Sequence, residues 1–140
     1  MRPTNRKQLF WAGSSKKDDM ASPPEVQDDL GYALDSVQAG VRVIPSATPL
    51  TEGKLKGLGI LELADDHDTD TYRAVYTTKI GDVVYVLHAF KKKSKSGIAI
   101  PKSDMDLILD RYRAAKKHYI EEVAAKMRRT PSENPLMKKR

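Results

Sequence analysis

Apolar residues recur along two stretches of the chain at the spacing of one helix face. Val26, Leu30, Ala33 and Val37 follow one another at steps of four, three and four residues, which predicts a helix over about 24–39. A second helix over about 102–125 is predicted by the same spacing at Met105, Ile108, Tyr112, Ala115 and Tyr119.

The first of these helices has clear boundary signals. Ser22-Pro23-Pro24-Glu25 has the spacing of a capping box, with proline at the first helical position, where a missing N–H costs little. Gly40 is a natural C-terminal stop. A shorter helix, capped by Ser14 or Ser15 and ending near Met20, precedes it. Residues 14–40 are therefore predicted to form a helical hairpin.

Short apolar or alternating runs predict strands at 7–13, 60–64, 71–80 and 83–90. Gly81-Asp82 predicts a tight turn between the last two, so the final three strands form an antiparallel meander. Residues 41–59, with two prolines and three glycines, are expected to form a loop, and the acidic residues 65–70 a solvated turn. The period of two places Arg73, Val75 and Thr77 on one face. The same period places Val84, Val86, His88 and Phe90 of the last strand together on one face.

The element order predicts an α+β fold: a small, mostly antiparallel sheet with an N-terminal helical hairpin and a long C-terminal helix. A chain of 140 residues is expected to form one domain, over 1–125, followed by a basic, disordered tail at 126–140.

The composition excludes several function classes. The chain has no cysteine, so disulfides, thiolate metal sites and a cysteine nucleophile are ruled out. No apolar run reaches the length of a membrane span or a signal peptide, so a cytoplasmic protein is expected. Asp66, Asp68 and Asp70 have the opening spacing of a calcium loop. However, Thr71 and Thr77 stand where glycine and glutamate are needed, so no metal site is predicted.

Positive charge gives the most informative chemical signal, but only locally. The net charge of +6 comes mainly from the two ends of the chain. Within the body, a cationic group is predicted where neighbouring strands end, and such a group on one face of the sheet suits a pentavalent phosphate. Each member also has a structural explanation, as an ion-pair partner, a core residue or a solubilising charge. The group consists of Lys54, Lys56, Arg73, His88, Lys91, Lys92 and Lys93.

Several segments together resemble a known family. They are Leu55-Lys56-Gly57, Leu61-Glu62-Leu63, Asp70-Thr71-Tyr72-Arg73-Ala74-Val75-Tyr76, and residues 84–95 followed by Gly97 and Pro101. In this order they resemble the HigB-like branch of the RelE superfamily, the toxins of bacterial type II toxin–antitoxin systems, often encoded in phage-derived genes. The similarity spans roughly residues 7–120.

The resemblance implies a RelE-like fold and an mRNA interferase that cuts messages on the ribosome. It also implies a cognate antitoxin, in this branch usually a HigA-like helix-turn-helix protein. Arg73 matches the strand arginine that contacts the scissile phosphate, and Lys54 and Lys56 match lysines before the second strand. Phe90 and the following lysines match the aromatic and basic end of the last strand.

The roles in such a reaction stay partly open. The RNA 2′-OH attacks the adjacent phosphate, which requires a proton acceptor and a proton donor. Arg73 is expected to bind the phosphate, one of Lys56, Lys91 or Lys92 to act as the base, and His88 to donate or accept a proton. RelE itself uses a tyrosine near its C-terminus that has no clear counterpart here. Contacts to RNA are expected from Lys54, Phe90, Lys93 and Lys95, with no cofactor.

A second function class is compatible with the same residues. A catalytically inactive RelE-like relative, acting as a binding module for a partner protein or for ribosomal RNA, needs the same cations, because binding a phosphate and cleaving it use the same charges.

Overall fold

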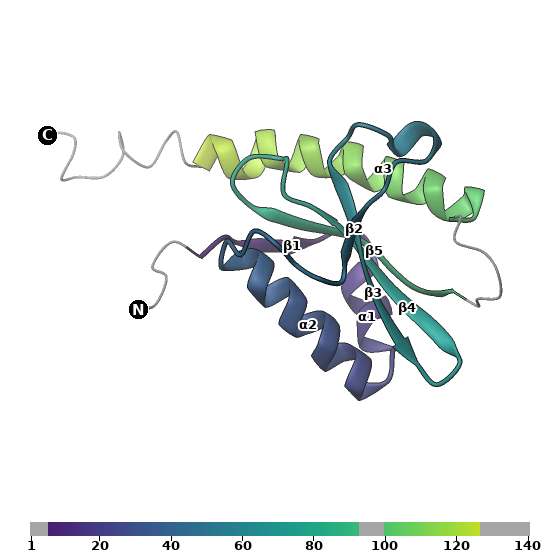
Figure 1. The fold of residues 1–140 in the computed structure, drawn as a ribbon. Helices are drawn as coiled ribbons and strands as arrows, with labels where there is room; N and C mark the ends of the chain where they lie inside the picture. The colour runs from purple at the N-terminus through teal and green to yellow at the C-terminus, as the bar shows by residue number, and fades with distance from the viewer. Residues whose placement is uncertain (1–5, 93–99, 127–140) are drawn as a thin grey trace, which may run out of the picture.

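A five-stranded sheet lies between two helical layers (Figure 1). The computed structural model describes residues 6–92 and 100–126. The sheet order is β1-β5-β4-β3-β2, with β1 parallel to β5 and every other pair antiparallel. The helical elements are α1 (Ser15–Met20), α2 (Pro24–Gln38), the short 3₁₀ helix η1 (Gly53–Leu55), α3 (Lys102–His118) and its π-helical continuation η2 (Tyr119–Ala124). The strands are β1 (Leu9–Trp11), β2 (Ala47–Pro49), β3 (Ile60–His67), β4 (Asp70–Thr77) and β5 (Val84–Lys92).

The two sides of the sheet carry two separate hydrophobic clusters. We call the side covered by α1 and α2 the α2 face, and the side covered by α3 the α3 face (Figure 1). On the α2 face, apolar residues of α2 pack against Leu63, Ala74, Val84 and Val86. On the α3 face, Ile108 and Ala115 pack with residues such as Ile60 and Val75. The α+β class and the mostly antiparallel sheet are therefore confirmed.

Both long helices form where the apolar spacing predicts them. Val26, Leu30, Ala33 and Val37 are all buried, and Pro24 occupies the first turn of α2. The capping-box prediction is wrong, however. The Ser22 hydroxyl donates to the Asp19 carbonyl at the end of α1 instead of capping α2, because α2 begins only after Pro23.

The loop predictions need three corrections. Residues 41–59 contain β2 and η1 and are not loop throughout. The acidic segment is mostly strand, because β3 continues to His67 and β4 begins at Asp70. Only Asp68 and Thr69 form the turn, with Asp68 at a positive φ of 57°, a backbone conformation that aspartate tolerates better than most residues. The last connection spans six residues, 78–83, and is not a two-residue turn.

Gly81 lies in this last connection and has a φ of 63°. A Cβ atom there would lie 2.2 Å from the Tyr119 ring. Any side chain would therefore have to push the Tyr119 ring aside and would also adopt a φ that few residues other than glycine favour, which explains the need for glycine in this turn.

The strand β5 contains an irregularity that changes which residues share a face. Val75 pairs with His88, but the next residue, Tyr76, pairs with Val86, so Leu87 is an extra residue in β5. Such a β-bulge shifts the alternation of side chains by one position. Val84 and Val86 consequently belong to the α2 face, whereas His88 and Phe90 lie on the α3 face. The prediction that these four share a face is wrong, because strict alternation assumes an unbroken ladder.

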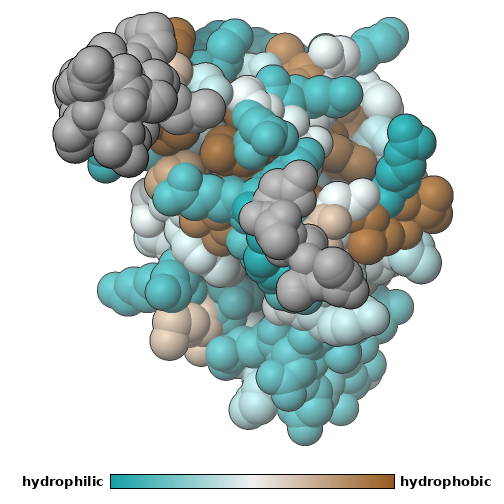
Figure 2. Space-filling view, turned by 90° about the vertical axis from the view of Figure 1, so that its left-hand side faces the viewer, coloured by the Kyte–Doolittle hydropathy of each residue, from teal (hydrophilic) through white to brown (hydrophobic). Residues whose placement is uncertain are grey.

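The surface has no single large apolar area in the view toward the chain termini. Figure 2 shows hydrophobic residues there in separate patches between hydrophilic ones. Across the described ranges 6–92 and 100–126, no helix has the length and apolar character needed to cross a membrane. The predicted tail, apart from Lys126, lies outside these ranges.

Candidate functional site

Three charged residues form a diagonal row across the α3 face. Arg73 of β4 lies opposite Ala64 and Phe90, so Glu62 of β3 and Lys92 of β5 are each two positions away on the neighbouring strands. Diagonal neighbours in a sheet lie about 7–8 Å apart, within reach of long side chains. We call Glu62, Arg73 and Lys92 the charged row.

The first contact in the charged row is a buried ion pair. Arg73 Nη1 donates to Glu62 Oε1, and the two side chains are only 15% and 7% exposed. Burial raises the pKa of the Glu62 carboxyl, and the Arg73 guanidinium only partly opposes this effect. Glu62 Oε2 and Arg73 Nε are buried without a hydrogen-bond partner in the structure. Both atoms therefore have unused hydrogen-bonding capacity in a position that solvent does not reach.

Lys92 completes the charged row and is also buried. Burial and the neighbouring Arg73 lower the pKa of its ammonium group, while Glu62 and Glu52 raise it. A lysine with a lowered pKa is a better proton acceptor near neutral pH. Among the three lysines predicted as possible bases, Lys92 is the one whose surroundings favour this role.

His88 lies on the same face but points toward α3. Its Nε2 atom is 2.8 Å from Asp104 Oδ1, its ring stacks on Phe90 with centroids 4.7 Å apart, and its side chain is only 8% exposed. His88 Nδ1 is buried without a hydrogen-bond partner. Phe90 is half-buried against the α3 core. This arrangement suits an anchoring role for His88 more than direct contact with RNA.

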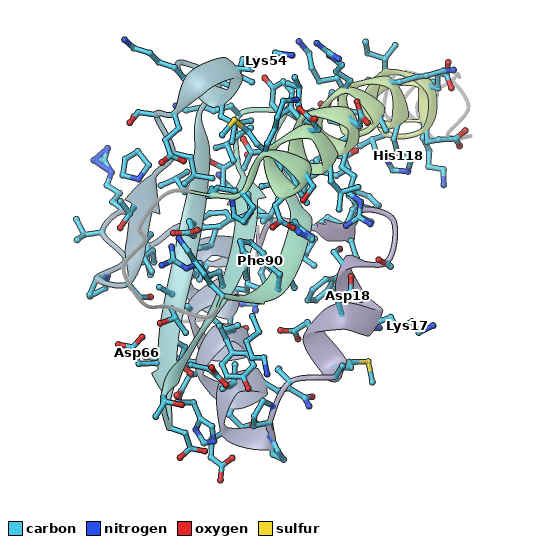
Figure 3. The ribbon with its side chains drawn as sticks, turned by 90° about the vertical axis from the view of Figure 1, so that its right-hand side faces the viewer. Lys17, Asp18, Lys54, Asp66, Phe90 and His118 are labelled. Carbon is cyan, nitrogen blue, oxygen red and sulfur yellow. The ribbon has the colours of Figure 1, made fainter. Side chains whose placement is uncertain are left out.

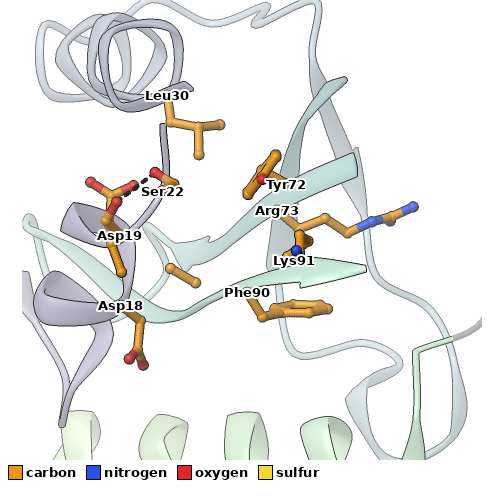
Figure 4. A pocket seen from close by; sticks show the side chains of 10 residues that line it. Asp18, Asp19, Ser22, Leu30, Tyr72, Arg73, Phe90 and Lys91 are labelled. Atoms are coloured by element: carbon orange, nitrogen blue, oxygen red, sulfur yellow. Dashed lines mark hydrogen bonds between the residues drawn. The ribbon is translucent and has the colours of Figure 1, made fainter. Parts of the chain in front are cut away.

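Lys91 lies on the opposite side of the sheet from the charged row. It pairs with Tyr72, and its Nζ atom is 3.6 Å from Asp70 Oδ2. With Asp18, Asp19 and Tyr72 it lines a pocket of about 190 Å³ beside α1. Arg73 also borders this pocket, but its side chain extends away from it (Figure 4). Burial raises the pKa of the Asp19 carboxyl. The expectation that Lys91 joins Arg73 on one face is therefore wrong, because the extra residue Leu87 in β5 shifts the alternation of every residue after it.

Lys54 and Lys56 lie at η1 and are exposed. In Figure 3, Lys54 is well separated from Phe90. Its charge acts on Asp106 of α3, where it contributes to a lowered pKa after the larger effect of the Lys102 hydrogen bond. No hydrogen bond or ion pair joins either lysine to Arg73 in the described part of the chain. Lys93 and Lys95 fall outside that part.

Sequence reasoning assigned no role to Glu62, Glu52 or Asp104. Glu62 had a usable signal, since it is a charged residue between two leucines in a predicted strand, and its neighbours point inward. Glu52 accepts a hydrogen bond from the Ile100 backbone N–H at 3.3 Å, a contact between distant segments that no local pattern indicates.

Metal ligands do not gather in the described structure: residues 6–92 and 100–126 contain no group of three His, Asp or Glu side chains suited to a metal ion. Asp66 accepts a hydrogen bond from Thr71, and Asp70 lies beside Lys91. The cations Arg73 and Lys92 of the charged row favour an anionic ligand such as a phosphodiester.

The fold and the charged row define a small α+β protein with two cations side by side on a sheet. The family described as "Phage derived protein Gp49-like" matches residues 19–113, more than half of the chain, and the chain belongs to this family. This family is of the RelE toxin type, so the predicted membership of the RelE superfamily is confirmed.

No curated protein matches the chain significantly. Among solved structures, a chain of the toxin–antitoxin complex RelBE2 from Mycobacterium tuberculosis is similar, with 16% identity and a TM-score of 0.42. The similarity covers 65% of this chain and 97% of that chain.

Proposed function

We propose that this chain is the toxin of a toxin–antitoxin pair and an endoribonuclease that cleaves mRNA on the ribosome. Membership of a RelE-type family supports the class of protein. The observation that carries the chemistry is the placement of Arg73 and Lys92 on adjacent strands of one face. Two neighbouring cations suit a phosphodiester whose negative charge grows in the transition state.

In the proposed reaction, the RNA 2′-oxygen attacks the adjacent phosphorus and the bond to the 5′-oxygen breaks. Lys92, as the neutral amine, accepts the 2′-OH proton, and Arg73 stabilises the phosphorane. A proton from water passes to the departing 5′-oxygen, and the protonated Lys92 returns its proton to solvent. The products are a 2′,3′-cyclic phosphate and a 5′-hydroxyl, and no metal takes part.

The partners proposed for this function are mRNA, the ribosome and a cognate helix-turn-helix antitoxin of the HigA type. A free endoribonuclease of this kind arrests growth, so the chain needs an inhibitor that covers the charged row or blocks entry to the ribosome. The proposed setting is the cytoplasm, where mRNA is translated.

The test is a purified translation system with one defined mRNA. The wild-type protein is expected to cut the message only when ribosomes are present, leaving a cyclic or 3′-phosphate on the upstream fragment. Cleavage by a ribosome-bound complex is expected to persist when free magnesium is chelated just enough to leave ribosomes intact. A 3′-hydroxyl product would contradict the 2′-OH mechanism, since it indicates attack by water.

One observation favours a second candidate function. Arg73 is already paired with Glu62 and mostly buried, so a chain that binds RNA or a partner protein without cleaving is also consistent with the site. In the same translation system, this candidate predicts ribosome or RNA binding and slower translation with every message intact.

A further inference from the structure

Glu62 is an unusual residue for the interior of a sheet. It lies between Leu61 and Leu63, yet its own side chain is 7% exposed on the opposite face, against Arg73. Burying an ionised carboxylate costs several kcal/mol unless it is paired. An apolar residue at this position would avoid that cost, so the carboxylate is expected to serve a purpose other than stability.

We propose that Glu62 is the positioning residue of the RNA site: its carboxylate, at the head of the charged row, holds Arg73 and Lys92 side by side for one phosphodiester. This inference rests on the proposed function and extends it to a residue without a previous role. Glu62 itself does not contact the reacting atoms.

The geometry supports this role in two ways. First, the Glu62 contact uses Arg73 Nη1, and Arg73 Nε remains unpartnered. Part of the guanidinium is thus fixed by the protein, while the buried Nε–H still lacks an acceptor. Second, the diagonal register puts Arg73 between Glu62 and Lys92, so fixing the guanidinium also fixes the charge next to Lys92.

The charges around Lys92 come from three elements. Arg73 of β4 lowers the pKa of Lys92, whereas Glu62 of β3 and Glu52, just before η1, raise it, and burial gives the largest effect, a lowering. Glu62 thus has a second consequence. Its negative charge limits how far burial and Arg73 lower the Lys92 pKa, and so contributes to the pH at which Lys92 becomes a neutral base.

The experiment replaces Glu62 by its neutral isostere, Glu62→Gln, and measures single-turnover mRNA cleavage on ribosomes over a range of pH. Loss of positioning is expected to lower the maximal rate by about 10²-fold, as small misplacements of catalytic groups do. The rising acidic limb of the profile is expected to move to lower pH, because removing a negative charge lowers the Lys92 pKa further. A merely structural role would not move this limb.

The matched control is Glu25→Gln, the same chemical change at an exposed position of α2 on the other face. It is expected to leave the rate and the pH profile unchanged. Circular dichroism and urea unfolding establish that each variant is folded. If Glu62→Gln fails to fold, Glu52→Gln provides the second arm. It leaves the Arg73–Glu62 pair in place and is expected to shift only the acidic limb, in the same direction.

A cleavage-independent readout separates this inference from the proposed function. The probe is a short RNA with a 2′-deoxy nucleotide at the scissile position, and NMR follows the Arg73 Nε–H and Lys92 side-chain signals. If the probe orders these two side chains more strongly in the wild type than in Glu62→Gln, the inference is supported. This holds even if the wild type cleaves no RNA, and in that case only the proposed function fails.

Several results overturn the inference. They are an unchanged rate and limb in folded Glu62→Gln, equal probe binding by both proteins, or faster cleavage by the variant, which would make Glu62 an inhibitor of Arg73. Complete loss of cleavage at every pH with normal probe binding also overturns it, since that result assigns the general base to Glu62 itself.

Discussion

The two faces of the sheet are built from the same strands but differ in the residues that they bury. The α2 face is closed by apolar residues of α2 over Leu63, Ala74 and Val86. The α3 face has a comparable apolar core, but it also buries Glu62, His88 and Lys92. Because side chains alternate in β3 and β4, each strand contributes to both faces. The purely apolar packing lies on the α2 face, and the buried charges of the candidate site lie on the α3 face.

This separation has an energetic reason. Buried charges are tolerated only where they find partners. On the α3 face, Arg73 pairs with Glu62 and His88 meets Asp104. The α2 face has no comparable buried ion pair among the described residues, so its apolar packing has no such cost to offset. The predictions below test whether function and stability respond separately to changes on the two faces.

The largest effect is expected from two neighbouring lysines on opposite faces. Lys92→Met keeps a long, unbranched side chain and removes the proposed base, so cleavage is expected to fall by about 10²-fold or more. Lys91→Met is expected to cost far less. Single-turnover cleavage by the two folded variants measures the difference, and equal losses would contradict the assignment of the charged row to the α3 face.

Arg73→Ala removes the proposed phosphate donor. Cleavage is expected to fall by about 10²–10³-fold, as loss of one transition-state donor does. The control is Lys117→Ala on α3, which is expected to retain wild-type cleavage. Because Arg73→Ala also leaves Glu62 unpaired, its fold is checked by urea unfolding. A folded, fully active Arg73→Ala protein would remove this residue from the site.

Leu63→Ala tests the α2 face. This side chain is fully buried, so the truncation is expected to lower the free energy of unfolding by about 2–5 kcal/mol. Below its unfolding temperature, the folded variant is expected to cleave at the wild-type rate. Urea unfolding and single-turnover cleavage measure the two quantities. A loss of cleavage without a loss of stability would show that the faces are not separate.

The pH dependence of stability gives a smaller effect. Because the pKa of Glu62 is raised in the folded protein, the folded state holds this proton more tightly than the unfolded state. Its contribution to stability is present at low pH and is lost as pH rises through the raised pKa. The stability of the wild type relative to Glu62→Gln is therefore expected to fall as pH rises from the ordinary pKa of a glutamate, about 4, through the raised pKa of Glu62. Urea unfolding at several pH values checks this, and a rising difference would contradict the burial of Glu62.

The smallest effect concerns Tyr85, at the other end of the α3 face. Burial, with a contribution from Tyr119, raises its pKa to about 12, and its hydroxyl lies 2.6 Å from His118 Nδ1. Rapid pH-jump absorbance is expected to show a late tyrosinate step that Tyr85→Phe lacks. Tyr32→Phe, at an exposed position of α2, is expected to keep that step. A late step that survives in Tyr85→Phe would belong to another tyrosine.

Much of the fold follows from local patterns in the sequence. The apolar spacing in α2 and α3 determined where each helix lies and which side it buries, because a helix that lacks a continuous apolar stripe has nothing to pack. The alternation in β4 likewise placed Arg73 and Val75 together. These predictions succeed because each depends on residues close together in the chain.

The membership of the charged row was decided by the tertiary structure. With strict alternation, Lys92 would share a face with Val84, and Lys91 would join Arg73. The extra residue at Leu87 reverses this and brings His88, Phe90 and Lys92 to the α3 face. The sequence by itself determined that a cluster of cations follows a strand next to Arg73. Which lysine reaches that arginine, and which carboxylate holds it, depends on strand register, because pairing between strands is set by packing over the whole sheet and not by neighbours along the chain.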